Sequence, residues 1–238
     1  MLKKTKCLLV VAAYLFTQPL LAQDKVSPVD KPPVDSEILG PTLNTLNQPP
    51  NQVNGFFSDS DCQSCGTGAQ TVADNFEIDA PGPGFRFRID QVVIWGGYLP
   101  GNTPSGTDDF TIQLRSDSAG APGNAPLYSA VGLQPDSRVD AGFDVMGADV
   151  YEFTFNLATP ANWGNGTWWI EIHNNTAATA GVDFFWVTGT VDDTHGIPNC
   201  LVSTEVPADN SFGITTGDLA IQLNGVNVPV ELMSFSID

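Results

Sequence analysis

The sequence predicts an all-β protein whose main domain is an antiparallel, two-sheet β-sandwich of jelly-roll-like type, spanning residues 55–225. Short stretches alternate apolar and polar residues with a period of two, and Gly, Pro, Asn and Asp separate them. After residue 22 no stretch keeps the apolar period of 3.6 that an amphipathic helix needs. One apolar face per strand is typical of antiparallel sheets, and two packed sheets bury seven or more such strands.

Seven stretches carry this alternation. They are residues 71–78, 85–95, 110–115, 151–157, 168–173, 182–187 and 219–224. Breaker-rich turns such as 99–102 (Leu-Pro-Gly-Asn) and 120–123 (Gly-Ala-Pro-Gly) lie between them. The apolar side of each stretch predicts the core, which we expect to include Phe87, Phe110, Ile112, Phe153, Phe155, Ile170, Ile172, Phe184, Trp186 and Ile221.

The first 22 residues have the layout of a secretory signal peptide. Three lysines precede an unbroken apolar run, Cys7–Phe16, and Ala22 precedes the expected cleavage at Gln23. The run is too short to span a bilayer as a stable helix. We therefore expect an exported protein that is secreted, at the cell surface or periplasmic, with no transmembrane anchor.

The segments that flank the predicted sandwich differ from it in composition. Residues 23–54 contain six prolines and few aromatics, which predicts a disordered spacer. Residues 226–238 alternate again, and Pro229 favours an edge strand or a peripheral tail.

The charge of the chain is strongly negative, at −18 for the full sequence. Removal of the signal peptide reduces nine Lys and Arg to six against 27 Asp and Glu, which gives −21. Such a field repels nucleic acids, so we expect no nucleic-acid partner. It attracts divalent cations and basic partners, but an acidic surface also keeps an exported protein soluble, and we favour that explanation.

Three cysteines follow the predicted cleavage site. The short spacing of Cys62 and Cys65 favours a structural disulfide in an oxidising compartment, with Cys200 free. A long-range bridge to Cys200 is the alternative. A redox or metal site would need a βαβ context or a second pair of ligands, and the sequence offers neither.

Clustered aspartates are the candidate ligands for a cofactor, which would be calcium. The candidates are Asp59, Asp61, Asp108 and Asp109, together with the adjacent pair Asp192 and Asp193. No twelve-residue calcium loop fits, because Gln70 stands where the loop starting at Asp59 would need Glu. Aspartates are also common turn residues, so we expect no cofactor and keep calcium as the alternative.

Two groups of residues are candidates for ligand binding. Trp169 and Phe185 lie opposite in phase to their core-facing neighbours, and exposed rings could stack on sugars. Strands covered on both faces would show the same pattern, and this is the interpretation that we favour. The loop after the aromatic strand provides the second group, Asp192, Asp193 and His195.

Catalytic motifs are missing from the sequence. It contains neither G-x-S-x-G nor H-E-x-x-H, and we interpret His173 as a surface residue. Glu152 and Glu171 could serve glycoside hydrolysis only as a convergent pair, and we interpret them as solvated and separate. We therefore expect a non-enzymatic binding or structural module with a glycan or a surface protein as partner. The alternative is a carbohydrate-active protein, either a sugar-binding module or a glycoside hydrolase.

Several segments, taken together, point to one group of proteins. They are residues 73–76 (ADNF), 94–98 (IWGGY), 109–112 (DFTI), 117–123 (DSAGAPG), 168–172 (WWIEI) and 183–186 (DFFW). The set resembles exported bacterial β-sandwich proteins of unassigned activity. The ending Val228–Phe235 resembles the Pro-Val-Glu-Leu segment near the C-termini of many exported bacterial proteins. The resemblance implies export and a sandwich fold, and it implies no activity.

Overall fold

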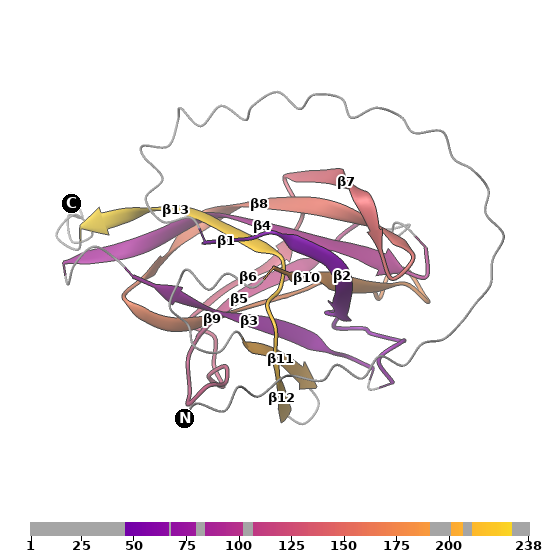
Figure 1. Cartoon of the computed structure of the whole chain (residues 1–238), viewed down its shortest axis with the longest axis horizontal. Helices are drawn as coiled ribbons and strands as arrows, with labels where there is room; N and C mark the ends of the chain where they lie inside the picture. The colour runs from indigo at the N-terminus through magenta and orange to yellow at the C-terminus, as the bar shows by residue number, and fades with distance from the viewer. Residues whose placement is uncertain are drawn as a thin grey trace, which may run out of the picture. The chain divides into compact units, whose positions relative to one another are not determined.

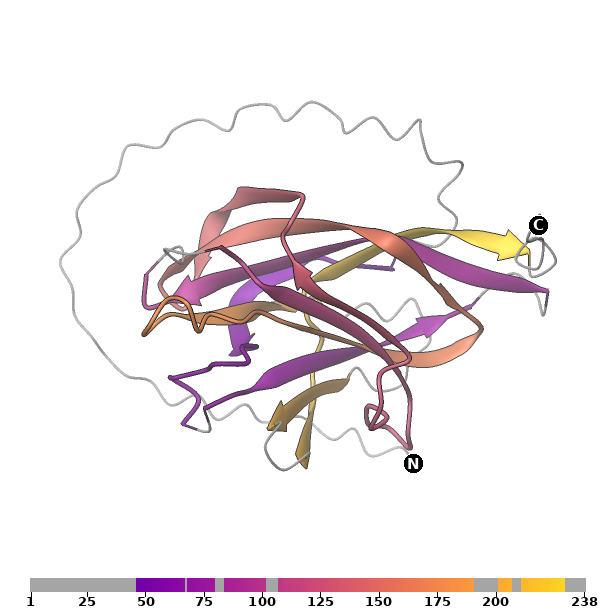
Figure 2. The same cartoon turned by 180° about the vertical axis from the view of Figure 1, so that it is seen from behind.

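The computed structural model describes residues 46–66, 68–79, 84–101, 107–190, 201–206 and 211–229, all within one compact unit, Leu39–Asp238. These residues form strands in two antiparallel sheets and contain no helix, so the all-β sandwich predicted from the sequence is confirmed. Figures 1 and 2 show β4, β8 and β13 in one layer, with β3, β9 and β11 in the other. The described residues include no helix long and apolar enough to cross a membrane.

The seven-stranded sheet is built around β4. Its strands are β1 (Leu46–Gln48), β2 (Pro50–Phe57), β4 (Phe85–Leu99), β7 (Ser137–Val145), β8 (Ala148–Trp163), β10 (Asp183–Gly189) and β13 (Ile221–Pro229). One edge of β4 pairs with β8, which in turn pairs with β7. β13 and β10 divide the other edge of β4 between them, and β1 and β2 lie outside these two strands.

The six-stranded sheet has the order β12-β11-β3-β9-β5-β6. Its strands are β3 (Thr71–Ile78), β5 (Phe110–Ser116), β6 (Tyr128–Leu133), β9 (Gly166–His173), β11 (Leu201–Val206) and β12 (Ser211–Thr216). Consecutive strands such as β3 and β4, or β9 and β10, belong to different sheets. These sequence neighbours therefore lie on opposite sides of the core. Within each sheet, most of the strands that pair with each other are distant in sequence.

The main core fills the space between the sheets. All ten residues predicted for it are buried, so this prediction is confirmed. Phe110 lies at its centre, with ring centroids 5.0 Å from Phe184 and 5.1 Å from Phe155. Tilted and edge-to-face rings at these distances stabilise the packing beyond the effect of apolar burial alone.

A second apolar cluster lies on the outer face of the seven-stranded sheet. It contains Val145, Ala148, Val150, Phe185, Val187 and Ala220. Phe185 pairs across the strands with Gly97. A Cβ atom at Gly97 would lie 2.7 Å from the Phe185 ring and 2.5 Å from the Asp149 carbonyl oxygen. Glycine is therefore required at this position for the ring to pack against β4.

The predicted domain boundaries need two corrections. β1 and most of β2 fall inside the segment predicted as a spacer to residue 54, because edge pairing accommodates prolines that the composition suggested would prevent strands. The strand expected after residue 226 is present as far as Pro229, but it continues β13 from Ile221 and does not begin a separate segment. The predicted signal peptide and residues 230–238 lie outside the described residues.

Candidate functional site

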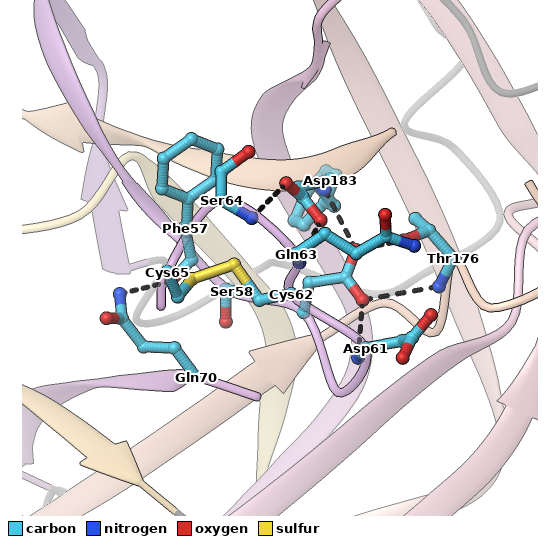
Figure 3. Close-up of a disulfide and its surroundings, with 12 residues drawn as sticks. Phe57, Ser58, Asp61, Cys62, Gln63, Ser64, Cys65, Gln70, Thr176 and Asp183 are labelled. Atoms are coloured by element: carbon cyan, nitrogen blue, oxygen red, sulfur yellow. Dashed lines mark hydrogen bonds between the residues drawn. A yellow bond between two sulfur atoms is a disulfide. The ribbon is translucent and has the colours of Figure 1, made fainter. Parts of the chain in front are cut away.

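A disulfide closes the turn that follows β2 (Figure 3). Cys62 and Cys65 form it, with their Cα atoms 5.5 Å apart. Cys62 is completely buried, while the two residues between the cysteines are exposed. The predicted pairing is confirmed, and Cys200 lies outside the described residues.

Asp183, at the start of β10, holds this disulfide turn in place. Its carboxylate accepts backbone N–H bonds from Gln63 at 2.7 Å and from Ser64 at 2.9 Å. Figure 3 shows the second of these bonds. A carboxylate disfavours a thiolate nearby, whereas redox-active cysteines lie in electropositive surroundings. The geometry therefore favours a structural disulfide.

Asp59 ties three segments of the chain together. Its completely buried carboxylate accepts backbone N–H bonds from Asp61 at 2.9 Å, Thr176 at 3.2 Å and Phe184 at 2.9 Å. The Thr176 hydroxyl donates a fourth bond at 2.8 Å. Burial raises the pKa of Asp59, and these hydrogen bonds act in the opposite direction. The β2–β3 loop, the β9–β10 loop and β10 thus share one anchor.

Asp108 forms a second buried anchor beside the first. Its carboxylate accepts hydrogen bonds from the Tyr98 hydroxyl, from Asn174 Nδ2 at 3.3 Å and from Arg138 Nη1 at 3.2 Å. Burial, and then the charge of Asp108, raise the pKa of Tyr98. Asn174 Oδ1 accepts the N–H of Asp109 at 2.9 Å, which fixes the segment before β5. We call the three joined segments 58–66, 107–109 and 174–182 the loop end.

The calcium hypothesis gains no support from this geometry. Asp59 uses one carboxylate oxygen to accept the N–H of Asp61, and Asp109 accepts a bond from the Asn175 side chain at 3.1 Å. Within the described ranges, no group of three or more His, Cys, Asp or Glu residues is placed to hold a metal ion. Three of the four predicted ligands that the structure describes instead accept hydrogen bonds within the loops, namely Asp59, Asp108 and Asp109.

The outer face of the six-stranded sheet carries a buried ionic cluster. Arg115 Nη2 lies 2.9 Å from Glu171 Oε2 and 3.7 Å from Glu205 Oε2. His173 Nδ1 lies 3.2 Å from Glu171 Oε1. We call these four residues the outer cluster. The interpretation of Glu171 as solvated is wrong, because only 4% of the residue is exposed.

The loop that follows β5 contacts the same sheet face as the outer cluster. Arg115 Nη1 donates to the carbonyl oxygens of Gly123 and Asn124, both at 3.1 Å. Trp169 Nε1 donates to Asp117 Oδ1 at 2.9 Å. Residues 117–123, one of the segments that carry the resemblance to exported proteins, thus provide hydrogen-bond acceptors for Arg115 and Trp169 on this face.

Neither candidate aromatic residue offers an exposed ring. Trp169 and Phe185 are both 0% exposed, the first on the outer face of the six-stranded sheet and the second in the outer apolar cluster. The favoured interpretation, strands covered on both faces, is confirmed. The hypothesis of an exposed stacking platform at these two residues is therefore wrong. Asp192, Asp193 and His195 lie outside the described residues.

Arg115 alone does not neutralise the outer cluster, because its single positive charge lies beside two carboxylates. Burial, and then the charge of Glu171, raise the pKa of Glu205, while Arg115 acts against this shift. Four polar atoms on this face are buried without a hydrogen-bond partner: Arg115 Nε, Thr71 Oγ1, His173 Nδ1 and Ser203 Oγ. Clusters of coupled ionisable groups with shifted pKa values occur at functional sites and also in structural ion-pair networks.

Sequence reasoning missed this cluster because β11, which supplies Glu205, was not predicted. The available signal was the phase of Arg115 and Glu171, which lie on the polar side of two predicted strands. Opposite charges of that kind can pair if the strands are neighbours. The structure shows that β5 and β9 are neighbours.

A further carboxyl group lies in the main core. Asp74 of β3 is 1% exposed, and its Oδ2 accepts the N–H of Leu219 at 3.0 Å. Burial, and then the charge of Asp218, raise the pKa of Asp74 well above its usual range. Asp74 thereby links the six-stranded sheet to the segment that enters β13.

Comparisons with protein-family models, with curated proteins and with solved structures find no match to this chain.

Proposed function

We propose that this chain is an exported, non-enzymatic β-sandwich module that recognises its ligand through the loop end. The observation that supports this proposal is that buried aspartates fix the loops at that end. Their carboxylates accept hydrogen bonds from segments that are far apart in the sequence; these residues are Asp59, Asp108 and Asp183. Loops fixed in this way need little ordering when a ligand binds, which favours affinity.

The exposed residues of the loop end indicate the chemistry of the ligand. Gln63, Ser64, Ala177, Ala178 and Gly181 are exposed and uncharged, although the chain has a net charge of −18. This favours a polar, uncharged ligand such as a glycan, or a surface protein that contacts the loops through its own polar groups.

Export has support from two independent features. The N-terminal sequence has the layout of a signal peptide. The Cys62–Cys65 disulfide fits an oxidising compartment, where such bonds persist. Fractionation of the source cells, followed by detection of the chain in the medium, periplasm and surface fractions, tests this part. Recovery from the cytoplasm with the first 22 residues intact would contradict it.

A glycan array with the purified protein tests recognition, followed by mapping of backbone amide chemical shifts with any glycan that binds. We expect the shifts to centre on the loop end. Ala178→Arg should then abolish binding, because it places a long charged side chain on that surface. Ser129→Arg, on exposed β6, is the matched control and should bind normally. Binding that survives Ala178→Arg would contradict the assignment to the loop end.

A glycoside hydrolase remains the second candidate, and the outer cluster is the observation that favours it. Glu171 and Glu205 lie 2.9 Å and 3.7 Å from the same Arg115 nitrogen, so two carboxyl groups lie side by side, and glycosidases use such a pair. The raised pKa of Glu205 suits a general acid. Polysaccharide hydrolysis that Glu171→Gln and Glu205→Gln abolish, and that Glu152→Gln preserves, would support this function and contradict the binding module.

A further inference from the structure

The open edges of the two sheets differ in how they are protected against pairing with another chain. Natural edge strands carry charges, bulges or prolines, or are very short. β7 carries Arg138, Asp140 and Asp144, and its register shifts between the two aspartates. β6 has a register shift beside Gly132, whose φ is 69°. Both strands are therefore poor templates for a further strand.

The two N-terminal edges of the seven-stranded sheet are protected in other ways. β1 is only three residues long. β2 begins with Pro50, Gln52 has a φ of 60°, and the pairing with β10 shifts register. A proline, a left-handed residue and an irregular register each interrupt the row of backbone groups that an incoming strand would need.

β12 has none of these protections. It pairs with β11 over six consecutive residues without a register shift. Its sequence, Ser-Phe-Gly-Ile-Thr-Thr, contains no charge and no proline. Residues 213–216 are all exposed, and Ile214 is 42% exposed. Figures 1 and 2 show β12 at the margin of its sheet, beyond β11.

We propose that β12 is an interaction edge that pairs antiparallel with β12 of a second copy of this chain. Identical antiparallel strands are related by a two-fold axis, which makes the contact closed and self-complementary. Because β12 is uncharged, the pairing places no like charges opposite each other. The β-branched residues Ile214, Thr215 and Thr216 favour an extended strand in the joined sheet.

The net negative charge of the chain predicts how salt affects this contact. Two copies that each carry −18 repel each other over a distance that salt shortens. An uncharged strand such as β12 lets two copies approach at less cost than a charged one, and added salt should strengthen the dimer. A dimer held by ion pairs would respond in the opposite direction.

Sedimentation velocity of the purified chain over a range of concentrations tests the proposal. We expect a monomer–dimer equilibrium that moves toward dimer as NaCl rises. Ile214→Lys and Thr215→Lys should each raise the dissociation constant by about tenfold or more, equivalent to roughly 1.4 kcal/mol. Val131→Lys, a substitution at an exposed position on β6, is the control and should leave the constant unchanged.

Hydrogen exchange of the wild-type protein is a second test, which does not depend on the lysine variants. It decides the matter if circular dichroism shows that a variant does not fold. In the wild-type protein, amides of residues 211–216 should gain protection as the concentration rises. A wild-type chain that stays monomeric in high salt would overturn the proposal. A dimer whose constant neither lysine variant changes, or whose formation leaves these amides unprotected, would also overturn it.

Discussion

The loop end and the outer cluster bury carboxylates in two different ways. At the loop end, Asp59 and Asp183 accept hydrogen bonds from backbone amides. In the outer cluster, Glu171 and Glu205 depend on the guanidinium of Arg115. Backbone amides are fixed parts of the chain, whereas a guanidinium is a single side chain that one substitution removes. The first arrangement fixes loop geometry, and the second makes sheet stability depend on one cation.

The largest expected effect comes from removal of that cation. Arg115→Met should lower the free energy of unfolding by about 3–5 kcal/mol, because it removes the guanidinium between two buried carboxylates and leaves only His173 beside Glu171. Urea unfolding measures the change. Arg88→Met is the matched control, since Arg88 and Asp90 form a partly exposed pair at 2.8 Å whose loss should cost about 0–1 kcal/mol. Equal losses for both variants would contradict the role assigned to Arg115.

The loop-end anchor should come next in size. Asp59→Ala leaves the buried amides of Thr176 and Phe184 without an acceptor, which should cost about 2–4 kcal/mol. Asp61→Ala is the control, because Asp61 contacts Asp59 through its backbone N–H, which the substitution keeps. Thermal unfolding of both variants decides between them. A control as unstable as Asp59→Ala would show that the loop does not depend on the buried carboxylate.

The disulfide should contribute less than either carboxylate arrangement. Replacement of both Cys62 and Cys65 by Ser should cost about 2 kcal/mol, because the closed loop is only four residues long. The effect should be confined to the loop end, with the sheets intact by far-ultraviolet circular dichroism. Cys200→Ser is the control, and it tests the prediction that Cys200 is free. Loss of a cross-link in the Cys200→Ser variant, seen by peptide mapping without reduction, would refute that prediction.

How much of this the sequence could predict depends on the range of the contacts. Alternation identified β3, β5 and β9 to within a residue or two and placed Phe110 and Phe184 in the core, because a strand's period is a local property. The same alternation assigned Glu171 to a polar face and therefore to solvent. Whether a second face is covered depends on segments distant in sequence, such as residues 117–123, and no local pattern reports them.

The smallest of the expected effects on stability depends on pH and comes from Asp74, whose carboxyl group is buried in the main core. Its raised pKa means that, above the usual value of 3.8, the unfolded chain releases this proton while the folded chain keeps it. The contribution of Asp74 to wild-type stability therefore falls as the pH rises from about 4 toward the folded-state pKa. Asp74→Asn should remove this dependence and gain stability relative to wild type with rising pH. A difference that is constant from acid to neutral pH would contradict the shift.

Amide hydrogen exchange tests most directly the claim that buried carboxylates hold the loop end in one conformation. The informative amides are those of Gln63, Ser64, Thr176 and Phe184, which donate to Asp183 or Asp59. We predict that the first three, although they lie in loops, exchange as slowly as the amide of Phe184, a main-core residue. Exchange of Gln63, Ser64 and Thr176 at the rate of an unstructured peptide would contradict the account.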